Sequence, residues 1–159
     1  MIELALYQPD IAPNAGSMLR MCACLGLTCR IIEPAGFLMS DSRFRRAGMD
    51  YLDQAALIRD PSWQAFRQAT AGRRSVLMTT RASLPYWDFR FHPDDVILLG
   101  RESSGVPEEV HAAVEVRLTI PMRPGMRSLN VAVSAAMVTG EALRQTGGFR
   151  LFGDPQAHE

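Results

Sequence analysis

Short apolar segments alternate with helical patterns along most of this chain, and this alternation constrains its fold more than any other feature. Strands that alternate with helices predict a parallel sheet flanked by helices, which is an α/β fold. We expect one compact domain over residues 1–150, followed by a frayed tail over residues 151–159. The strand-like runs fall at residues 2–7, 28–33, 55–59, 75–80, 95–99 and 117–120.

Capping residues and glycines indicate where the helices between these strands begin and end. Asn14 is a good N-cap for a helix from residue 15 to about 25, which Gly26 then ends. Asp60 followed by Pro61 predicts the start of a helix that runs to residue 71. Further helices are predicted around 42–46, over 107–113 and over 130–145, and the rest of residues 37–52 reads as irregular.

Composition removes several classes of protein. The chain has 159 residues and is 47% hydrophobic, which fits a folded domain with its own core. No apolar run reaches membrane-spanning length, and Met1 leads directly into a strand-like segment rather than a signal peptide. Three cysteines and three scattered histidines match no metal-ligand spacing. We therefore expect a cytoplasmic protein with no membrane segment and no metal.

The formal net charge is zero, so no overall positive field predicts a nucleic-acid partner. All 17 basic residues are nevertheless arginine, and there is no lysine. Codon bias in a GC-rich genome explains this composition best. The guanidinium group binds phosphate through two parallel hydrogen bonds, so the cluster of Arg43, Arg45 and Arg46 remains a candidate RNA contact.

The common phosphate-binding and nucleophile motifs of α/β enzymes are absent. The first strand runs into Q-P-D-I-A-P-N-A-G and not into the glycine-rich dinucleotide fingerprint. A chain without lysine cannot contain a P-loop, and no serine sits in a G-x-S-x-G turn.

The segment from Ile120 to Ala136 is the most distinctive part of the chain. A stiff loop with two prolines, a glycine, Arg123 and Arg127 leads into Ser128-Leu129-Asn130 at the start of an apolar helix. Ser128 and Asn130 are both suitable caps for that helix. The free N–H groups of a helix start also suit a small polar ligand.

Three segments at separated positions together carry a family resemblance. They are Asn14-x-Gly16-x-x-x-Arg20, the run Leu98 to Pro107 (L-L-G-R-E-S-S-G-V-P), and Ile120-Pro121 through Ser128-Leu129-Asn130-Val131. They resemble the three signature motifs of the SpoU branch of the SPOUT methyltransferases. Supporting segments are Tyr7-Gln8-Pro9, I-I-E-P-x-G-F at 31–37 and R-R-A-G-x-D-Y at 45–51. The resemblance covers nearly the whole chain and is greatest to the small, single-domain members that act on tRNA.

The resemblance implies an activity and a topology. Enzymes of this branch transfer a methyl group from S-adenosylmethionine to a ribose 2′-hydroxyl of RNA. The small members modify the wobble nucleotide, C or U at position 34, of leucine tRNAs. The C-terminal part of the fold is threaded into a trefoil knot, and the enzymes are homodimers with sites near the subunit interface.

The resemblance also implies roles for particular residues, and each has a simpler structural reading. Arg20 would be catalytic, although arginine on a helix is usually a surface residue. Glu102 would orient a hydrogen bond or Arg20 rather than neutralise a sulfonium, because over-stabilising the donor's charge slows the reaction. The apolar candidates could be plain core residues. The implied catalytic set is Asn14, Arg20, Glu102, Ser128 and Asn130, and the implied cofactor set is Met78, Gly100, Glu102, Ile120, Met122, Ser128 and Leu129.

Two departures keep the RNA target open. Arg101 stands where a proline is usual in the small tRNA enzymes, and Ala132 where a serine is common. One alternative is a 2′-O-methyltransferase for another tRNA position or for rRNA. Others are a non-catalytic RNA-binding dimer and, more remotely, a nucleotide-binding regulator.

Overall fold

A six-stranded sheet forms the centre of the computed structural model, which describes residues 1–152. Its strand order is β3-β2-β1-β5-β4-β6, and every neighbouring pair is parallel. The strands are β1 (Glu3–Tyr7), β2 (Thr28–Ile32), β3 (Ala56–Asp60), β4 (Ser75–Met78), β5 (Val96–Leu99) and β6 (Val116–Leu118). The helices are α1 (Ala12–Cys24), α2 (Ser42–Gly48), α3 (Trp63–Ala69), α4 (Glu108–Ala113) and α5 (Val131–Thr146), with short 3₁₀ turns η1 (Met49–Asp53), η2 (Tyr86–Asp88) and η3 (Gly148–Phe152).

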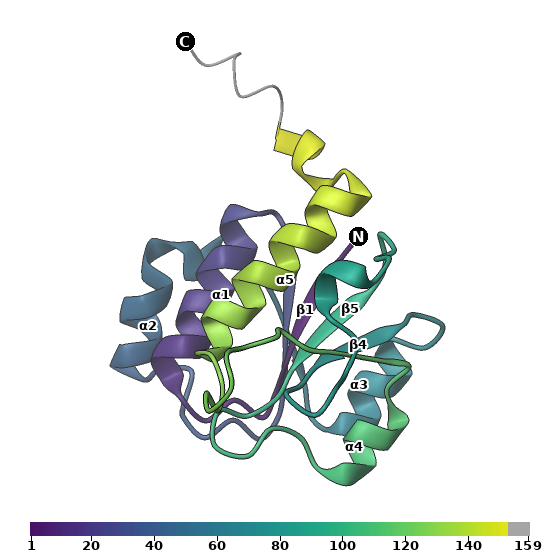
Figure 1. Cartoon of the computed structure of the whole chain (residues 1–159). Helices are drawn as coiled ribbons and strands as arrows, with labels where there is room; N and C mark the ends of the chain where they lie inside the picture. The colour runs from purple at the N-terminus through teal and green to yellow at the C-terminus, as the bar shows by residue number, and fades with distance from the viewer. Residues whose placement is uncertain (153–159) are drawn as a thin grey trace.

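Helices cover both faces of this sheet, which explains why the inner strands β4 and β5 are buried along nearly their whole length (Figure 1). In β1, Leu4 and Leu6 face the cluster built with α1, α2 and α5, whereas Ala5 and Tyr7 face the cluster built with α3 and α4. The central strand β5 alternates in the same way. The predicted α/β fold and all six predicted strands are thus confirmed, with differences of one or two residues at their ends.

Two predicted helix caps are wrong. Helix α1 begins at Ala12, so Asn14 lies inside its first turn and its side chain is free for other partners. Helix α3 begins at Trp63 and is capped by Ser62, whose hydroxyl accepts a hydrogen bond from the Ala65 amide at 3.1 Å. In α1 the proline, Pro13, lies inside the first turn, whereas Pro61 lies just before the cap of α3.

The Asp60 side chain is used in the core instead of as a cap. It is the last residue of β3 and accepts two hydrogen bonds from the guanidinium of Arg30 in β2, at 2.8 and 2.9 Å. Both side chains are buried, and each charge is compensated by the other. A buried charge without a partner would lower the stability of the fold.

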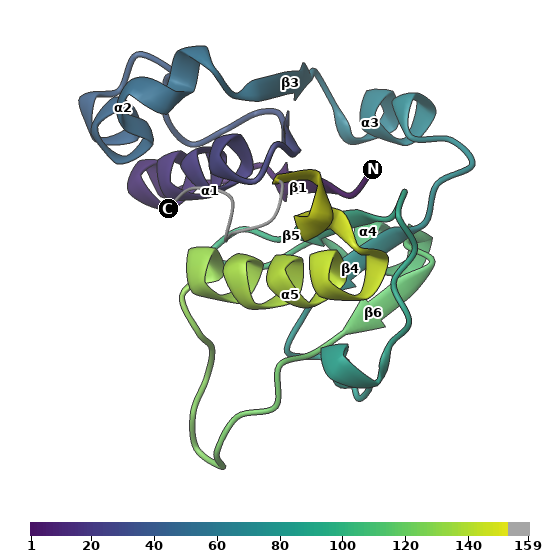
Figure 2. The ribbon, with the colours of Figure 1, turned by 90° about the horizontal axis from the view of Figure 1, so that it is seen from above.

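The parallel strands all end at one edge of the sheet, and the loops that follow them gather there. The long loop over residues 119–130 leaves β6 at the border of the sheet and returns to α5, which packs beside α1 (Figure 2). This loop is almost entirely exposed. This loop brings Asn130 into contact with Asn14, which lies 116 positions earlier in the chain.

Some remaining expectations concern the chain ends, membranes and metals. Residues 151–152 complete η3, and the rest of the expected tail lies outside the described residues. Within residues 1–152, no helix is long and apolar enough to cross a membrane. No group of three histidine, cysteine or acidic residues in the same range is placed to hold a metal ion.

Candidate active site

A cavity of about 600 Å³ opens at the carboxyl ends of β1, β4, β5 and β6. Open parallel sheets bind their ligands at this edge. The volume of the cavity lies within the range of small-molecule sites. All three motif segments line it, through Asn14, through residues 99–106, and through residues 119–131. The structure therefore brings together residues as far apart in the chain as Asn14 and Asn130, which are 116 positions apart.

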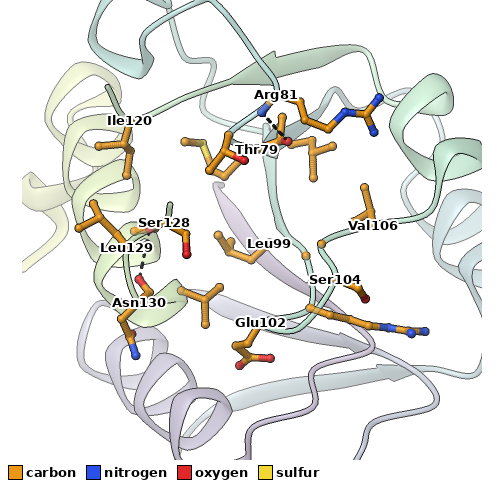
Figure 3. A pocket seen from close by; sticks show the side chains of 18 of the residues that line it. Thr79, Arg81, Leu99, Glu102, Ser104, Val106, Ile120, Ser128, Leu129 and Asn130 are labelled. Atoms are coloured by element: carbon orange, nitrogen blue, oxygen red, sulfur yellow. Dashed lines mark hydrogen bonds between the residues drawn. The ribbon is translucent and has the colours of Figure 1, made fainter. Parts of the chain in front are cut away.

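Apolar side chains form opposite walls of the cavity. Ile120 and Leu129 lie on the α5 side, Val106 lies across from them, and Leu99 lies between (Figure 3). Leu129 is 40% exposed although it is large and apolar, so its side chain is available to a ligand rather than used in the core. The other members of the predicted cofactor set also line the cavity: Met78, Gly100, Glu102, Met122 and Ser128.

The loop between Gly100 and Gly105 is a closed turn whose backbone is tightly packed. The Arg101 and Gly105 amides each donate to the other residue's carbonyl, both at 2.9 Å. A Cβ at residue 100 would come within 2.8 Å of the Gly105 backbone, and Gly105 itself has a φ of +66°. Only glycine suits both positions, and its lack of a side chain leaves the backbone of the turn accessible from the cavity.

A chain of polar side chains links the three motifs. The Asn14 side-chain Nδ2 donates to the Glu102 carboxylate at 3.3 Å, and the Asn14 side-chain Oδ1 accepts from the side-chain Nδ2 of Asn130 at 3.0 Å. The Asn130 oxygen in turn accepts from the amides of Ala132 and Val133, which confirms its predicted role as the cap of α5. Asn14 is thus a connection between Glu102 and Asn130.

Asp10, which no sequence motif singled out, completes this network on the far side of Glu102. The Asp10 amide donates to the Glu102 carboxylate, and the Glu102 amide donates to the Asp10 carboxylate, both at 3.2 Å. Burial, and then the neighbouring Asp10 carboxylate, raise the pKa of Glu102 above its ordinary value. The pKa of Asp10 is lowered, mainly by its hydrogen bonding with Glu102, so Asp10 is the member of the pair that ionises first.

Arg20 lies outside the cavity lining, two turns along α1 from its first turn. Its guanidinium donates to the Met49 sulfur at 2.8 Å and lies over the Tyr51 ring at 5.4 Å from the centroid. Of the two roles expected for Glu102, the structure agrees with orienting a hydrogen bond, since Glu102 is bonded to Asp10 and Asn14, whereas Arg20 contacts Met49 and Tyr51 instead. Arg20 is exposed and keeps donors that face solvent.

The three arginines of the predicted RNA contact lie on α2. All three are exposed, and Arg43 forms an ion pair with Asp41, the cap of that helix, at 2.8 Å. Arg45 and Arg46 occupy the last turn of α2, immediately before the Met49 and Tyr51 that contact Arg20. The cluster and Arg20 are therefore neighbours on one surface.

The predicted site residues leave out several residues that line the cavity. Thr79, Thr80 and Arg81 follow β4 and line the opening together with Val106 and His111. Residues 79–81 are a candidate loop on sequence grounds, because loops at that end of a parallel sheet carry the ligand, but no motif singles out a residue among them. Arg81 forms an ion pair with Glu108, the first residue of α4, at 3.0 Å.

Comparison with known proteins agrees with the geometry. The model of the SpoU rRNA Methylase family matches residues 1–140. A tRNA (cytidine(34)-2'-O)-methyltransferase from Beijerinckia indica is 67% identical over 146 residues, which cover 91% of each chain. The corresponding enzyme of Escherichia coli K12 is 36% identical over 92% of this chain and 95% of its own.

Solved structures give the same result. A structure that gives insights into the 2-OH methylation of C/U34 on tRNA superposes with a TM-score of 0.88 and 41% identity, over 91% of this chain and 95% of the other. The SpoU methyltransferase AviRb from Streptomyces viridochromogenes, in complex with the cofactor AdoMet, shares the fold with a TM-score of 0.79 and 24% identity. That match covers 96% of this chain and 61% of AviRb. The predicted resemblance is confirmed, and the C-terminal knot is implied by the family. The chain belongs to the SpoU methylase family.

Proposed function

We propose that this protein transfers a methyl group from S-adenosylmethionine to the ribose 2′-hydroxyl of nucleotide 34, C or U, in leucine tRNAs. The observation that carries the proposal is the convergence of the three motif segments on one cavity, linked by the contacts of Asn14 with Glu102 and Asn130. The names of the Beijerinckia and Escherichia relatives, which match almost end to end, support the position and the nucleotide.

The cavity fits the cofactor by size and by chemistry. Its apolar walls suit an adenine ring, and the bare backbone between Gly100 and Gly105 allows close approach of a polar ribose or amino-acid group. When bound, S-adenosylmethionine supplies an electrophilic methyl group on a positively charged sulfur. The residues that would hold it are Met78, Gly100, Glu102, Ile120, Met122, Ser128 and Leu129. We propose no metal in this reaction.

Arg20 would act on the RNA and not on the cofactor. A guanidinium stays protonated at physiological pH, so it is a poor base for a hydroxyl proton. It can instead hold a phosphate next to the target ribose and stabilise negative charge that develops on the attacking oxygen. The exposed position of Arg20, beside the cavity rather than in it, is consistent with a partner as large as RNA.

The polar network would fix the target side of the site. Asn14, Glu102 and Asn130 hold one another in a single arrangement, and Ser128 lies next to them on the cavity wall. A site that is already ordered does not lose free energy to reorganisation during the reaction.

Substrate binding and assembly are further parts of the proposal. Arg43, Arg45 and Arg46 would contact tRNA phosphates, and two copies of the chain would form a homodimer through the exposed apolar side of α5. Val133 and Met137, one turn apart on that helix, are 49% and 38% exposed. With tRNA as substrate, the enzyme would work in the cytoplasm.

Transfer of labelled methyl groups tests the reaction and its target together. The protein is incubated with S-adenosylmethionine labelled in the methyl group and with leucine tRNA transcripts carrying C or U at position 34. Nuclease mapping is expected to find the label in the ribose of nucleotide 34, and a matched tRNA with a 2′-deoxynucleotide there should take up none. Label at another nucleotide, or in rRNA, would overturn the assignment of the target. Cofactor binding without transfer to any RNA would overturn the enzymatic proposal.

A further inference from the structure

Asp10, which belongs to none of the three motifs, joins the loop after β1 to the loop after β5. It lies in the loop after β1, and its contacts reach across to the loop after β5, 92 residues later. Its amide donates to the Glu102 side chain, its carboxylate accepts from the Glu102 amide, and the Ser103 hydroxyl donates to the other carboxylate oxygen. Both the main chain and the side chain of Glu102 are therefore held by one residue.

The direction of these bonds determines where the Glu102 carboxylate points. One of its oxygens is taken by the Asp10 amide, and the other accepts from the side chain of Asn14. Asn14 then accepts from Asn130, the cap of α5. A shift of Glu102 would leave the Asn14 amide without its acceptor and weaken the connection to α5.

We propose that Asp10 is a positioning residue of the active site: it clamps the loop after β5 to the loop after β1 and so orients Glu102 toward Asn14. The inference rests on the proposed methyl transfer for its effect on turnover. It concerns the protein's own side chains, so its geometric part can be tested without RNA.

The charges near Glu102 make the clamp measurable. Among the described residues that bond to the Glu102 side chain, Asp10 from the β1 loop is ionisable and Asn14 from α1 is neutral. Behind Asn14 stands the neutral Asn130, and the guanidinium of adjacent Arg101 lies over the Tyr7 ring. Burial raises the pKa of Glu102 first, and the Asp10 carboxylate raises it further. Removing the charge of Asp10 should therefore let Glu102 ionise at lower pH.

Two substitutions separate the clamp from the charge. Asp10→Asn keeps an oxygen that can accept from the Glu102 amide but removes the negative charge. Asp10→Ala removes both. The Glu102 carboxyl titration is followed by ¹³C NMR in the free protein, and kcat and KM for tRNA and the Kd for S-adenosylmethionine are measured for each variant. Ser62→Ala is the control for general destabilisation, because Ser62 caps α3 on the other face of the sheet.

The proposal expects three results together. Glu102 titrates at lower pH in Asp10→Asn than in the wild type, and the acid limb of the methylation rate moves in the same direction. Asp10→Ala lowers kcat at least tenfold, with a smaller change in cofactor Kd, whereas Asp10→Asn retains most of kcat. Ser62→Ala leaves the kinetic constants and the Glu102 titration unchanged.

Either of two results would overturn it. One is an unchanged Glu102 titration in Asp10→Asn, and the other is wild-type kcat in Asp10→Ala. If Asp10→Ala does not fold, Asp10→Asn still decides through the titration and the acid limb. Should the wild type methylate no tRNA, the proposed function fails, but the NMR titration and the cofactor Kd still report on the clamp.

Discussion

At the scale of single residues, Arg20 differs from the other candidate catalytic groups because it contacts protein through a sulfur and an aromatic ring. Met49 and Tyr51 hold its guanidinium without neutralising its charge. A cation over a ring keeps its full charge and can still donate hydrogen bonds to an anion. This environment leaves the guanidinium able to bind a phosphate of the RNA.

Replacement of Arg20 by alanine should therefore affect the RNA and spare the cofactor. We expect Arg20→Ala to lower the rate of methyl transfer by about 10²–10³, as loss of a group that stabilises the developing oxyanion does. Arg20 is not part of the cavity lining, so the Kd for S-adenosylmethionine, measured by calorimetry, should stay within about twofold. Arg20→Lys keeps the charge without the planar guanidinium, so its rate of methyl transfer should lie between those of the wild type and Arg20→Ala. A parallel loss of cofactor affinity would assign Arg20 to the cofactor site.

The family resemblance identified nine of the residues that line the cavity, but not how their side chains are bonded. Asn14 reads as a helix cap because asparagine before a helical pattern usually is one. Only the actual start of α1 at Ala12 frees its amide for Glu102 and Asn130. The role of Asp10 was hidden for the same reason, since its partners come from a loop 92 residues away.

At the scale of elements, the packing of α1 on α2 decides where Arg20 is held. Gly16 lies at the contact, where a Cβ would come within 2.5 Å of the Phe44 carbonyl oxygen and 2.7 Å of the Ala47 side chain. The two helices can approach this closely only because Gly16 has no side chain. The approach brings η1, with Met49 and Tyr51, beside Arg20.

Adding one methyl group at Gly16 should test this packing. Gly16→Ala is expected to lower the free energy of unfolding by about 1–3 kcal/mol, because a backbone carbonyl must move to make room. Gly140→Ala is the matched control in α5, where a Cβ meets nothing within 4 Å and alanine favours the helix by roughly 0.5–1 kcal/mol. Urea unfolding measures both. Equal stability of Gly16→Ala and the wild type would mean that α2 shifts freely.

The elements themselves were largely readable from the sequence. All six strands were predicted, and the central ones, β1 and β5, are the clearest because strands buried on both faces are nearly continuous apolar runs. In the region 37–52, the short helix predicted around 42–46 corresponds to α2, which runs two residues further, whereas η1 was read as irregular. Short helical segments depend on tertiary packing more than on local sequence, which is why the pattern over residues 49–53 did not predict η1.

At the scale of the whole molecule, the exposed apolar side of α5 has no covering element within residues 1–152. The sequence reads this helix as apolar nearly all round, and the structure buries Ala135, Val138 and Leu143 while Val133 and Met137 remain exposed. A second copy of the chain would remove these side chains from water. The order of strands could be anticipated only through the family resemblance, because the pairing of β1 with β5 joins segments about 90 residues apart.

A charge placed on this side of α5 should separate the proposed dimer. The Val133→Glu/Met137→Glu double variant is expected to elute as a monomer in size-exclusion chromatography with light scattering, since an interface cannot bury two unpaired carboxylates. Leu38→Glu serves as control, because Leu38 is 75% exposed on the loop after β2. A double variant that remains dimeric at micromolar concentration would exclude this face of α5 as the interface.

The zero net charge of the chain makes its affinity for tRNA depend on local clusters, and the salt dependence of binding can identify them. Each lost phosphate contact should lower the slope of log K against log salt by about 0.7–0.9. Reversal of the charges at Arg43, Arg45 and Arg46 is therefore expected to weaken tRNA binding at low salt and to reduce this slope by about two. Arg90→Glu is the control, because Arg90 is exposed but precedes β5 and so lies toward the amino ends of the strands, away from the cavity. Filter binding from 50 to 300 mM salt, roughly the range in which counterion release dominates, gives both slopes. If the triple variant keeps the wild-type slope while its affinity falls, the arginines of α2 act through the fold of the helix and do not contact the RNA.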